Sequence, residues 1–347
     1  MRKVRLTQKR IAEKLGISVT TVSRALRDLP DISQQTKDAV VKLAQEGNYL
    51  PNTNAIGLRK RETHRIGVII PEIVHFYFSS MISGIMECAE KNGYSVLLTQ
   101  TNESYQREIL EAEMLFSTIV DGLLVCLSNE SKTLKHFEKF QDYGIPVVFF
   151  DKVKYDLEAS TVVVEDHKGA FDATQHLIDV GCKRIAHLKG PRLPVNAKRR
   201  LQGYLDALET NKIAIDESII KEGFTMSRRE AFEFTKELLE HKNPIDGIFA
   251  ANDLVAIGAI DAVKEKGLRI PEDVAIVGFS DSEIADIVSP KLSSIHQPGF
   301  ELGHSAMEVL LEEIPIYAED KTPEFKNVVL ATSLVVRESS KRIKAQE

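Results

Sequence analysis

The chain has 347 residues, which is long for a single domain and allows a large buried core. With 43% hydrophobic and 28% charged residues it has the composition of an ordinary soluble globular protein, and it contains no apolar run of about 18 residues that would predict a membrane span. The net charge of −6 is unevenly distributed, because residues 1–65 carry 14 Lys and Arg against 6 Asp and Glu, whereas the other residues carry 31 against 45. A basic N-terminal module on an acidic body indicates that the N-terminal part binds a polyanion, with a solvated basic tail as the alternative.

The N-terminal sequence MRKVRLTQKR is basic but is not followed by an apolar segment, so no secretory signal is predicted. The three cysteines, Cys88, Cys126 and Cys182, lie far apart and have no CxxC spacing. Isolated cysteines of this kind are expected to be reduced and buried, which favours a cytoplasmic protein.

The segment 7–27, TQKRIAEKLGISVTTVSRALR, is predicted to form two short helices joined by a tight turn. Thr7 and Ser18 are suited to begin the two helices, since a hydroxyl can accept a hydrogen bond from the free N–H groups of a first helical turn. Gly16 suits the left-handed conformation that ends a helix. The apolar residues fall at helical spacing: Ile11, Ala12 and Leu15, then Val22, Ala25 and Leu26. This is the helix-turn-helix pattern, in which the second helix enters the DNA major groove, and a helical hairpin that only packs is the alternative.

A third helix is predicted over residues 34–46, with Ser33 as its cap and Gly47 after its end. Three helices around one small core would complete an all-α head. The segment that follows, YLPNTNAIGLRKR at residues 49–61, is too short to hold a stable helix alone, and Pro51 could begin a helix but not continue one.

Residues 11–52 resemble the DNA-binding head of the LacI/GalR family of bacterial transcription regulators, and the resemblance continues to about Val336. The residues that carry it in the head are Ala12, Gly16, Ser18, Thr21 to Arg24, Leu26, Thr36, Tyr49, Pro51 and Asn52. The resemblance implies a head over residues 1–50, a hinge over 51–61 and a body over 62–340. It also implies the residues that contact operator DNA, which are Thr7, Ser18, Val19, Thr20, Thr21, Ser23 and Arg24 in the head and Asn52, Ala55 and Leu58 in the hinge.

In regulators of this family the hinge folds into a helix on operator DNA, and a leucine from each of two hinges wedges between base pairs in the minor groove. Leu58 occupies the matching position. The sequence departs from the family pattern at Ile56, where a polar or Arg residue is frequent, and at Gly57, which disfavours a helix by about 0.5–1 kcal/mol relative to Ala. A flexible basic linker is the alternative for this segment.

The body is predicted to alternate strands with helices in two batches, which is typical of two doubly wound α/β subdomains with parallel sheets. The first batch begins with the continuous apolar strand RIGVIIP, and the second begins at VVVED, residues 162–166. The resemblance implies the fold of periplasmic sugar-binding proteins, with subdomains of about 62–160 plus 293–323 and about 161–292 plus 324–340. Ligands of such sheets bind beyond the carboxyl ends of the strands, so a shared cleft between the subdomains is expected.

Candidate effector-binding residues follow strands or open helices, and the resemblance implies that they contact the effector or shape its pocket. They are Tyr77, Phe78, Ser128, Asp151, Arg200, Phe224, Asp253 and Ser280. A helix cap or a surface ion pair is the alternative role of each. Ser280 stands in GFSD where the family often has GFDD or GFDN, so the site lacks a carboxylate that commonly contacts the effector.

The sequence contains no GxSxG, HExxH, P-loop or GxGxxG followed by an acidic residue in the context that each catalytic or metal-binding motif requires. The nine His residues are scattered without ligand spacing, so neither a metal nor another cofactor is expected. The sequence therefore predicts a cytoplasmic, ligand-responsive DNA-binding regulator, expected to be a repressor. It would bind a near-palindromic operator as a homodimer and a sugar or sugar derivative in the cleft, without a membrane partner. A cytosolic solute-binding protein and a sugar- or nucleoside-acting enzyme remain the alternatives.

Overall fold

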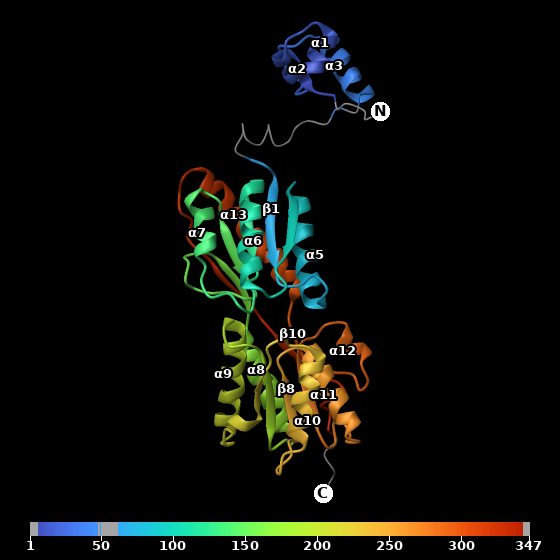
Figure 1. Cartoon of the computed structure of the whole chain (residues 1–347), viewed down its shortest axis with the longest axis vertical. Helices are drawn as coiled ribbons and strands as arrows, with labels where there is room; N and C mark the ends of the chain where they lie inside the picture. The colour runs from blue at the N-terminus through green and yellow to red at the C-terminus, as the bar shows by residue number, and fades with distance from the viewer. Residues whose placement is uncertain (1–5, 48, 50–61, 343–347) are drawn as a thin grey trace. The chain divides into compact units, whose positions relative to one another are not determined.

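The computed structural model describes residues 6–47, 49 and 62–342, which form two compact units within residues 1–63 and 64–347 (Figure 1). The hinge residues Asn52, Ala55, Ile56, Gly57 and Leu58 lie outside the described residues, so the predictions made for them stay predictions. None of the described helices is long and apolar enough to cross a membrane.

The N-terminal unit contains the three predicted helices, α1 (Gln8–Leu15), α2 (Val19–Ala25) and α3 (Gln34–Glu46). The three predicted caps are confirmed. Thr7 accepts from the Arg10 N–H at 3.3 Å, Ser18 from the Thr21 N–H at 3.0 Å, and Ser33 from the Thr36 N–H at 3.3 Å. Gly16 ends α1 with φ of 64°, a left-handed conformation that a Cβ would strain. The core of this unit is formed by Ile11, Ala12, Val22, Ala25, Val40 and Ala44.

The first sheet of the body is six-stranded and parallel, in the order β11-β5-β4-β3-β1-β2. Its strands are β1 (Arg65–Ile70), β2 (Ser95–Gln100), β3 (Gly122–Val125), β4 (Val147–Phe150), β5 (Thr161–Val164) and β11 (Asn327–Leu330). One face packs against α5 (Phe76–Lys91) and α13 (Gly299–Ala318), and the other against α6 (Tyr105–Thr118) and α7 (Lys135–Asp142). The central strands are apolar on both sides because both faces are covered.

The second sheet has the order β12-β10-β9-β8-β6-β7 and is parallel except for β12. Its strands are β6 (Ile185–Lys189), β7 (Ile220–Glu222), β8 (Gly247–Ala250), β9 (Ala275–Ser280), β10 (Ser293–His296) and β12 (Ser333–Val335). One face packs against α8 (Asp166–Asp179) and α9 (Val195–Thr210). The other packs against α10 (Arg228–Leu239) and α11 (Asp253–Glu265), while the short η1 (Glu217–Ile219) and α12 (Ile284–Ile287) lie in connections. The predicted fold class, a helical head and two parallel-sheet α/β subdomains, is confirmed.

Three strands belong to the other subdomain from the one predicted. β5 and β11 were assigned to the second subdomain but pair in the first sheet, and β10 was assigned to the first subdomain but pairs in the second sheet. The chain therefore crosses between β5 and α8, between β10 and α13, and between β11 and β12. A short apolar strand is equally suited to either buried sheet, so its local sequence does not specify its neighbour.

Helices α5 and α13 approach so closely that each has a glycine at the contact. A Cβ on Gly84 would lie 2.1 Å from the Phe300 carbonyl oxygen, and a Cβ on Gly303 would lie 2.0 Å from the Met81 carbonyl oxygen. Both distances are far below contact, so the backbones can meet here only without side chains. The contact fixes α13, which directly follows the second crossover, against the first helix of the body.

Candidate DNA-binding surface and effector cavity

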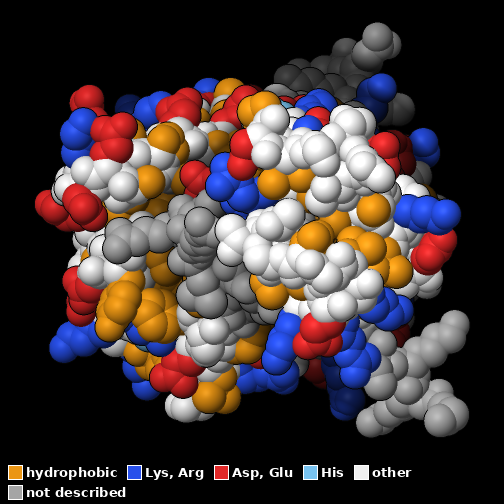
Figure 2. All heavy atoms as spheres, turned by 90° about the horizontal axis from the view of Figure 1, so that it is seen from above, with side chains coloured by type: hydrophobic (Ala, Val, Ile, Leu, Met, Phe, Trp, Pro, Cys, Tyr) orange, Lys and Arg blue, Asp and Glu red, His pale blue; other side chains and the backbone are white. Residues whose placement is uncertain are grey.

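The second helix of the head presents a polar surface opposite its buried side. Val22 and Ala25 are buried in the head core, whereas Val19 is 44% exposed and Thr20 and Arg24 are exposed. Of the other predicted contacts, Thr7 and Ser18 are exposed, and Thr21 and Ser23 are half-buried. Figure 2 shows Lys and Arg side chains interspersed with Asp and Glu on the described atoms of the face that it draws.

Some of these polar groups already have partners within the head. The Ser18 and Thr21 hydroxyls lie 2.8 Å apart, and Ser18 also caps α2. The Arg24 guanidinium forms an ion pair with Asp31 at 2.5 Å, in which both side chains are nearly half exposed. An exposed pair of this kind contributes only about 0–1 kcal/mol, so it leaves Arg24 able to exchange Asp31 for a phosphate or a base.

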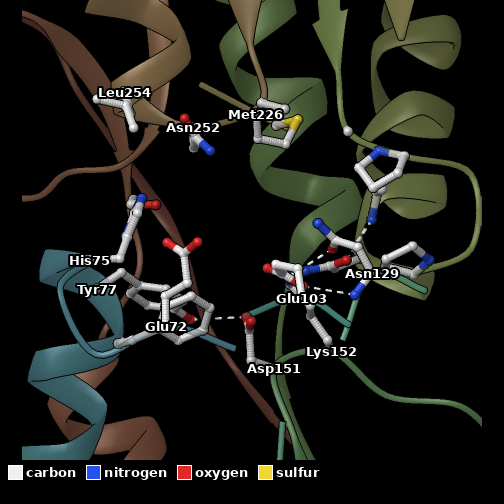
Figure 3. A pocket seen from close by; sticks show the side chains of 18 of the residues that line it. Glu72, His75, Tyr77, Glu103, Asn129, Asp151, Lys152, Met226, Asn252 and Leu254 are labelled. Carbon is white, nitrogen blue, oxygen red and sulfur yellow. Dashed lines mark hydrogen bonds and ion pairs between the residues drawn. The ribbon is translucent and has the colours of Figure 1, made fainter. Parts of the chain in front are cut away.

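A cavity of about 250 Å³ in the body is lined by residues of both subdomains (Figure 3). Five predicted effector residues line it: Tyr77, Phe78, Asp151, Arg200 and Ser280. The other lining residues are Glu72, His75, Glu103, Asn129, Lys152, Gly190, Pro191, Pro194, Asn196, Ala197, Thr225, Met226, Ser227, Ala251, Asn252, Leu254 and Gln297. Polar groups of this cavity lie beyond the carboxyl ends of strands in both sheets, where parallel α/β sheets bind ligands.

Three predicted effector residues do not line the cavity. Ser128 is buried, and its N–H donates to the Glu108 carboxylate at 2.7 Å. Phe224 is 69% exposed outside the cavity, while its N–H donates to Glu230 at 2.9 Å. A position directly after a strand can turn inward beneath a loop or outward to solvent, so the strand-end rule does not by itself place a side chain in the cavity.

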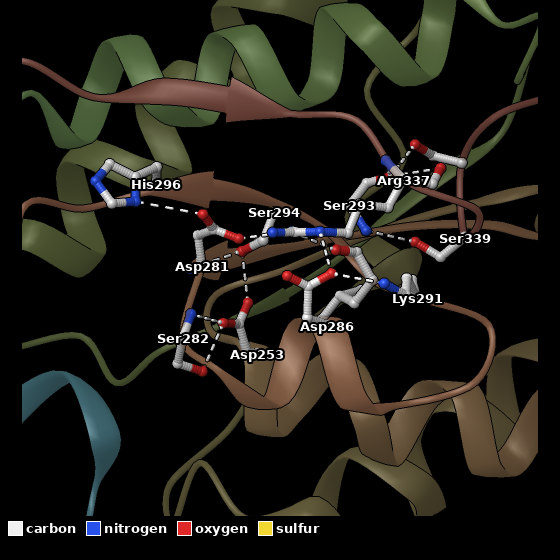
Figure 4. Close-up of polar contacts among 12 residues, drawn as sticks. Asp253, Asp281, Ser282, Asp286, Lys291, Ser293, Ser294, His296, Arg337 and Ser339 are labelled. Atoms are coloured by element: carbon white, nitrogen blue, oxygen red, sulfur yellow. Dashed lines mark hydrogen bonds and ion pairs between the residues drawn. The ribbon is translucent and has the colours of Figure 1, made fainter.

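Asp253 is the third of these residues and holds a loop together (Figure 4). Its buried carboxylate accepts from the Ser282 N–H at 2.8 Å, from the Ser282 hydroxyl at 2.9 Å and from the Ser294 hydroxyl at 2.5 Å. Burial raises the pKa of Asp253 to about 6, although these donors stabilise the ionised form. The residue therefore fixes the chain just after Ser280 and acts on the cavity only through that loop.

Asp151, which directly follows β4, is buried and has few hydrogen-bond donors. Tyr77 donates its hydroxyl to Oδ1 at 3.3 Å, and the Cys126 thiol donates weakly to Oδ2 at 3.7 Å. Burial, followed by the nearby negative charge of Asp166, raises the pKa of Asp151 to about 6. This carboxylate can accept further hydrogen bonds from a molecule in the cavity.

The Arg200 side chain is held rigidly at the second sheet. Its Nε donates to Asp166 at 2.8 Å and its Nη1 donates to the Ala251 carbonyl at 2.7 Å. The guanidinium also lies over the Phe279 ring, 3.8 Å from the ring centroid. Two of its donor nitrogens are thus occupied, and the side chain shapes the cavity with little freedom to move.

Lys152 neighbours Asp151 and forms a second fixed polar group. Its ammonium pairs with Glu103 and donates to Asn129 Oδ1 at 2.8 Å, while Asn129 N–H donates to Glu103 at 2.7 Å. Burial, and then the positive charge of Lys152, lowers the pKa of His75.

Some lining residues that the sequence analysis did not name also stand shortly after strands, so the strand-end rule could have indicated them. They are Glu103, Asn129, Lys152 and Asn252, which follow β2, β3, β4 and β8.

A chain of side-chain hydrogen bonds joins the two subdomains at the cavity. The Ser280 hydroxyl donates to Gln297 Oε1 at 2.9 Å, Gln297 Nε2 donates to the Tyr77 hydroxyl oxygen at 3.1 Å, and Tyr77 donates to Asp151. Gln297 lies in the crossover between β10 and α13. A ligand that forms a hydrogen bond with Ser280 or Asp151, at either end of this series of hydrogen bonds, therefore affects the crossover segment that contains Gln297.

The loop at 223–226 is held by one carboxylate from outside the cavity. Glu230 accepts from the N–H groups of Phe224, Thr225 and Met226 at 2.9–3.0 Å, and from the Thr225 hydroxyl at 3.0 Å. Thr225 and Met226 line the cavity, so Glu230 positions this part of its wall.

Among the residues that the structure describes, no group of three or more His, Cys, Asp and Glu could hold a metal ion.

Both units match known protein families. Residues 7–52 match the model of bacterial regulatory proteins of the lacI family, and residues 174–340 match the periplasmic binding protein-like domain. The chain is 32% identical over 340 residues to the HTH-type transcriptional repressor PurR of Haemophilus influenzae (strain PittEE), covering 97% of this chain and 99% of the relative. It is also 32% identical over 332 residues to the ribose operon repressor of Halalkalibacterium halodurans, covering 95% and 96%.

Solved structures agree with these sequence matches. The lac repressor dimer bound to operator and the anti-inducer ONPF is 26% identical, with a TM-score of 0.83 and coverage of 97% of this chain and 99% of that chain. The transcriptional regulator CelR in complex with cellobiose is 28% identical, with a TM-score of 0.73 and coverage of 96% and 100%. The chain therefore belongs to the LacI family of bacterial regulatory proteins, a family of cytoplasmic transcription regulators rather than enzymes, and is a DNA-binding transcriptional regulator.

Proposed function

We propose that this regulator is a repressor that binds a near-palindromic operator as a homodimer, and that a sugar or sugar derivative in the cavity changes its affinity for the operator. The relatives support the operator and the ligand class, since they include a ribose operon repressor, a regulator in complex with cellobiose and an operator-bound dimer. The proposal includes no enzymatic step, so the ligand should be recovered unchanged after incubation with the protein.

The observation that carries the ligand response is the hydrogen-bond chain from Ser280 through Gln297 and Tyr77 to Asp151. A ligand hydroxyl that bonds to Asp151 or Ser280 competes with, or extends, this chain at the crossover. Such a ligand has different affinities for different arrangements of the subdomains, and only a difference of this kind can shift their populations.

On the DNA side, the proposed contacts in the head are Thr7, Ser18, Val19, Thr20, Thr21, Ser23 and Arg24. The exposed side of α2 supports Val19, Thr20 and Arg24 in particular. The limits of the head at 1–50 and of the hinge at 51–61, and the hinge contacts from Asn52, Ala55 and Leu58, stay part of the proposal. A dimer places two heads on two half-sites, which requires two-fold symmetry in the operator.

The test begins with selection of DNA that the full-length protein binds from a random pool. A mobility-shift titration then compares the selected palindrome with a single half-site, and each of a set of sugars is tested for its effect on operator affinity. Arg200→Ala should abolish the response to an active sugar and keep operator affinity, because Arg200 is buried in the body. Lys198→Ala, an exposed change on the same helix, is the matched control and should respond normally. Equal binding to half-site and palindrome would refute the dimer, and a normal response from Arg200→Ala would refute its role in the site.

A further inference from the structure

The charged groups that line the effector cavity differ in how far the protein already neutralises them. Three carboxylates, those of Glu72, Glu103 and Asp151, and two cations, those of Lys152 and Arg200, line the cavity. Which of them remains able to bind a ligand group depends on the partners each one has. We propose that the cavity binds a ligand rich in hydrogen-bond donors and without negative charge, namely a neutral or amine-bearing sugar, and that it excludes phosphorylated and carboxylated sugars. This inference rests on the proposed function.

Both cations are already committed to protein partners. Lys152 is mostly buried, with 12% of its side chain exposed, and its ammonium is paired with Glu103 and bonded to Asn129 at 2.8 Å. Arg200 is 10% exposed and is paired with Asp166, itself buried, at 2.8 Å, with a second bond to the Ala251 carbonyl. A ligand anion would have to compete with the half-buried Glu103 for Lys152 or with the buried Asp166 for Arg200, and displacing Asp166 would leave a buried carboxylate without its cation, which is strongly unfavourable.

The two remaining carboxylates have few or no such partners. Asp151 accepts only long bonds, from the Tyr77 hydroxyl at 3.3 Å and the Cys126 thiol at 3.7 Å. No hydrogen bond or ion pair joins the half-buried Glu72 carboxylate to another described residue. Figure 3 shows the carboxylates of Glu72 and Asp151 directed towards the space between the labelled side chains. These two groups offer free acceptors to a hydroxyl or an ammonium group.

His75, which also lines the cavity, does not supply a positive charge. Burial, and then the charge of Lys152, lowers the pKa of His75, which favours its neutral form near pH 7. Its Nδ1 is buried and has no partner among the described residues, so the neutral ring can exchange one hydrogen bond with a ligand. An anionic ligand would therefore meet two carboxylates without an uncommitted cation, while a hydroxyl or ammonium group would satisfy them.

The experiment uses matched sets of sugars and the full-length protein. Ribose, glucose and galactose would each be compared with their amino, phosphate and aldonate derivatives, together with cellobiose, by calorimetric titration at pH 7.5. We expect binding from neutral or amino members, and binding at least about tenfold weaker from the phosphate and the aldonate of the same sugar, a factor equivalent to about 1.4 kcal/mol. A phosphate or aldonate that binds as tightly as its parent sugar would overturn the proposal.

Variants identify the groups responsible. Glu72→Gln should reduce the difference between a sugar and its phosphate, since it removes one repelling charge while keeping the side-chain shape. Glu113→Gln, an exposed change on α6 away from the cavity, is the matched control and should leave the difference unchanged. Anion binding that persists in Glu72→Gln but is lost in Lys152→Met would show that Lys152 is free to bind an anion, and would contradict the inference.

Different results would contradict the proposed function and the charge assignment, by which we mean the inference that the ligand carries no negative charge. If no sugar of any charge class binds while the selected operator is still bound, the proposed effector class is wrong and the charge assignment falls with it. If a phosphate or aldonate binds in the cavity and its binding is lost in Arg200→Ala, the sugar-responsive function stands and the charge assignment alone is wrong.

Discussion

Ionisation of Asp151 should control effector affinity, and lowering the pH is the simplest perturbation. Burial and the negative charge of Asp166 raise the pKa of Asp151 to about 6 in the free protein. A ligand hydroxyl or ammonium that donates to the carboxylate favours the ionised form, so the pKa of Asp151 falls in the complex. Binding below pH 6 then requires the release of a proton, and affinity should decrease as the pH falls.

The size of this effect follows from the ionised fraction of Asp151. At pH 8 the carboxyl is almost fully ionised, whereas at pH 5, about one unit below its pKa, roughly one molecule in ten is ionised. The apparent dissociation constant should therefore rise about tenfold between pH 8 and pH 5, with most of the change below pH 6.5. Other charged groups near Asp151 are Lys152, Arg200 and Asp166, and His75 lines the same cavity.

Isothermal titration calorimetry at pH 5, 6, 7 and 8 would measure this dependence directly. Repeating each titration in buffers of different ionisation heat counts the protons released, which should approach one below pH 6. Asp151→Asn should bind more weakly at pH 8 and show no such pH dependence, while His75→Gln should retain it. Affinity of the wild type that is constant from pH 5 to pH 8, or an equal slope in Asp151→Asn, would refute the assignment.

Three further outcomes are expected from other parts of the structure. Arg24→Ala should weaken operator binding by about 1–3 kcal/mol if Arg24 reads a base, and equal loss on operator and unrelated DNA in mobility-shift titrations would instead make it a phosphate contact. Gly84→Ala should lower the free energy of unfolding by about 1–3 kcal/mol or more in urea titrations, because its Cβ would lie 2.1 Å from a carbonyl oxygen, whereas Ser83→Ala on the exposed side of α5 should change it little. Burial raises the pKa of Asp253 to about 6 and that of Glu313 to about 7, so each contributes stability that is present at low pH and lost as the pH rises; between pH 5 and pH 7 the loss should be about 1.3 kcal/mol for Asp253 and about 2 kcal/mol for Glu313. Burial lowers the pKa of His187 to about 3, which changes stability in the opposite direction, so the loss is measured as the difference in free energy of unfolding between the wild type and Asp253→Asn or Glu313→Gln at each pH. A difference that does not decrease from pH 5 to pH 7 would contradict the assignment.

The parts of the fold that depend on neighbouring residues could be predicted from the sequence. Thr7, Ser18 and Ser33 are caps because a hydroxyl reaches the N–H group three residues later whatever the rest of the chain does. The family resemblance, together with the rule that ligands bind beyond parallel strands, predicts Asp151 and Ser280 as effector residues, and both line the cavity. This rule predicts which part of the chain lies near the ligand, but not the direction in which each side chain points. Ser128 and Asp253 follow strands as the rule requires, yet both are bonded to neighbouring segments and do not line the cavity.

The assignment of strands to sheets depends on contacts that the local pattern does not contain. β5 reads TVVV and β10 reads SSIH, and either sequence satisfies the requirements of a buried strand in either sheet. Their true neighbours are set by the whole path of the chain, through three crossovers. Gln297 lies in one of these crossovers, so its place in the cavity, and its bond to Tyr77, follow from topology and could not be read from the residues around it.

The charge of the ligand that the cavity accepts depends on which of the cavity's charged side chains already have partners in the protein. From the sequence alone, Lys152 and Arg200 in a cavity favour a phosphate as readily as a hydroxyl group, because a free cation binds either. The folded chain brings Glu103 to Lys152 from 49 residues away and Asp166 to Arg200 from 34 residues away, so both cations are neutralised by residues that have no link to them in the sequence. The carboxylates without such partners, Glu72 and Asp151, are then the groups that a ligand must satisfy, and they select for donors and against anions.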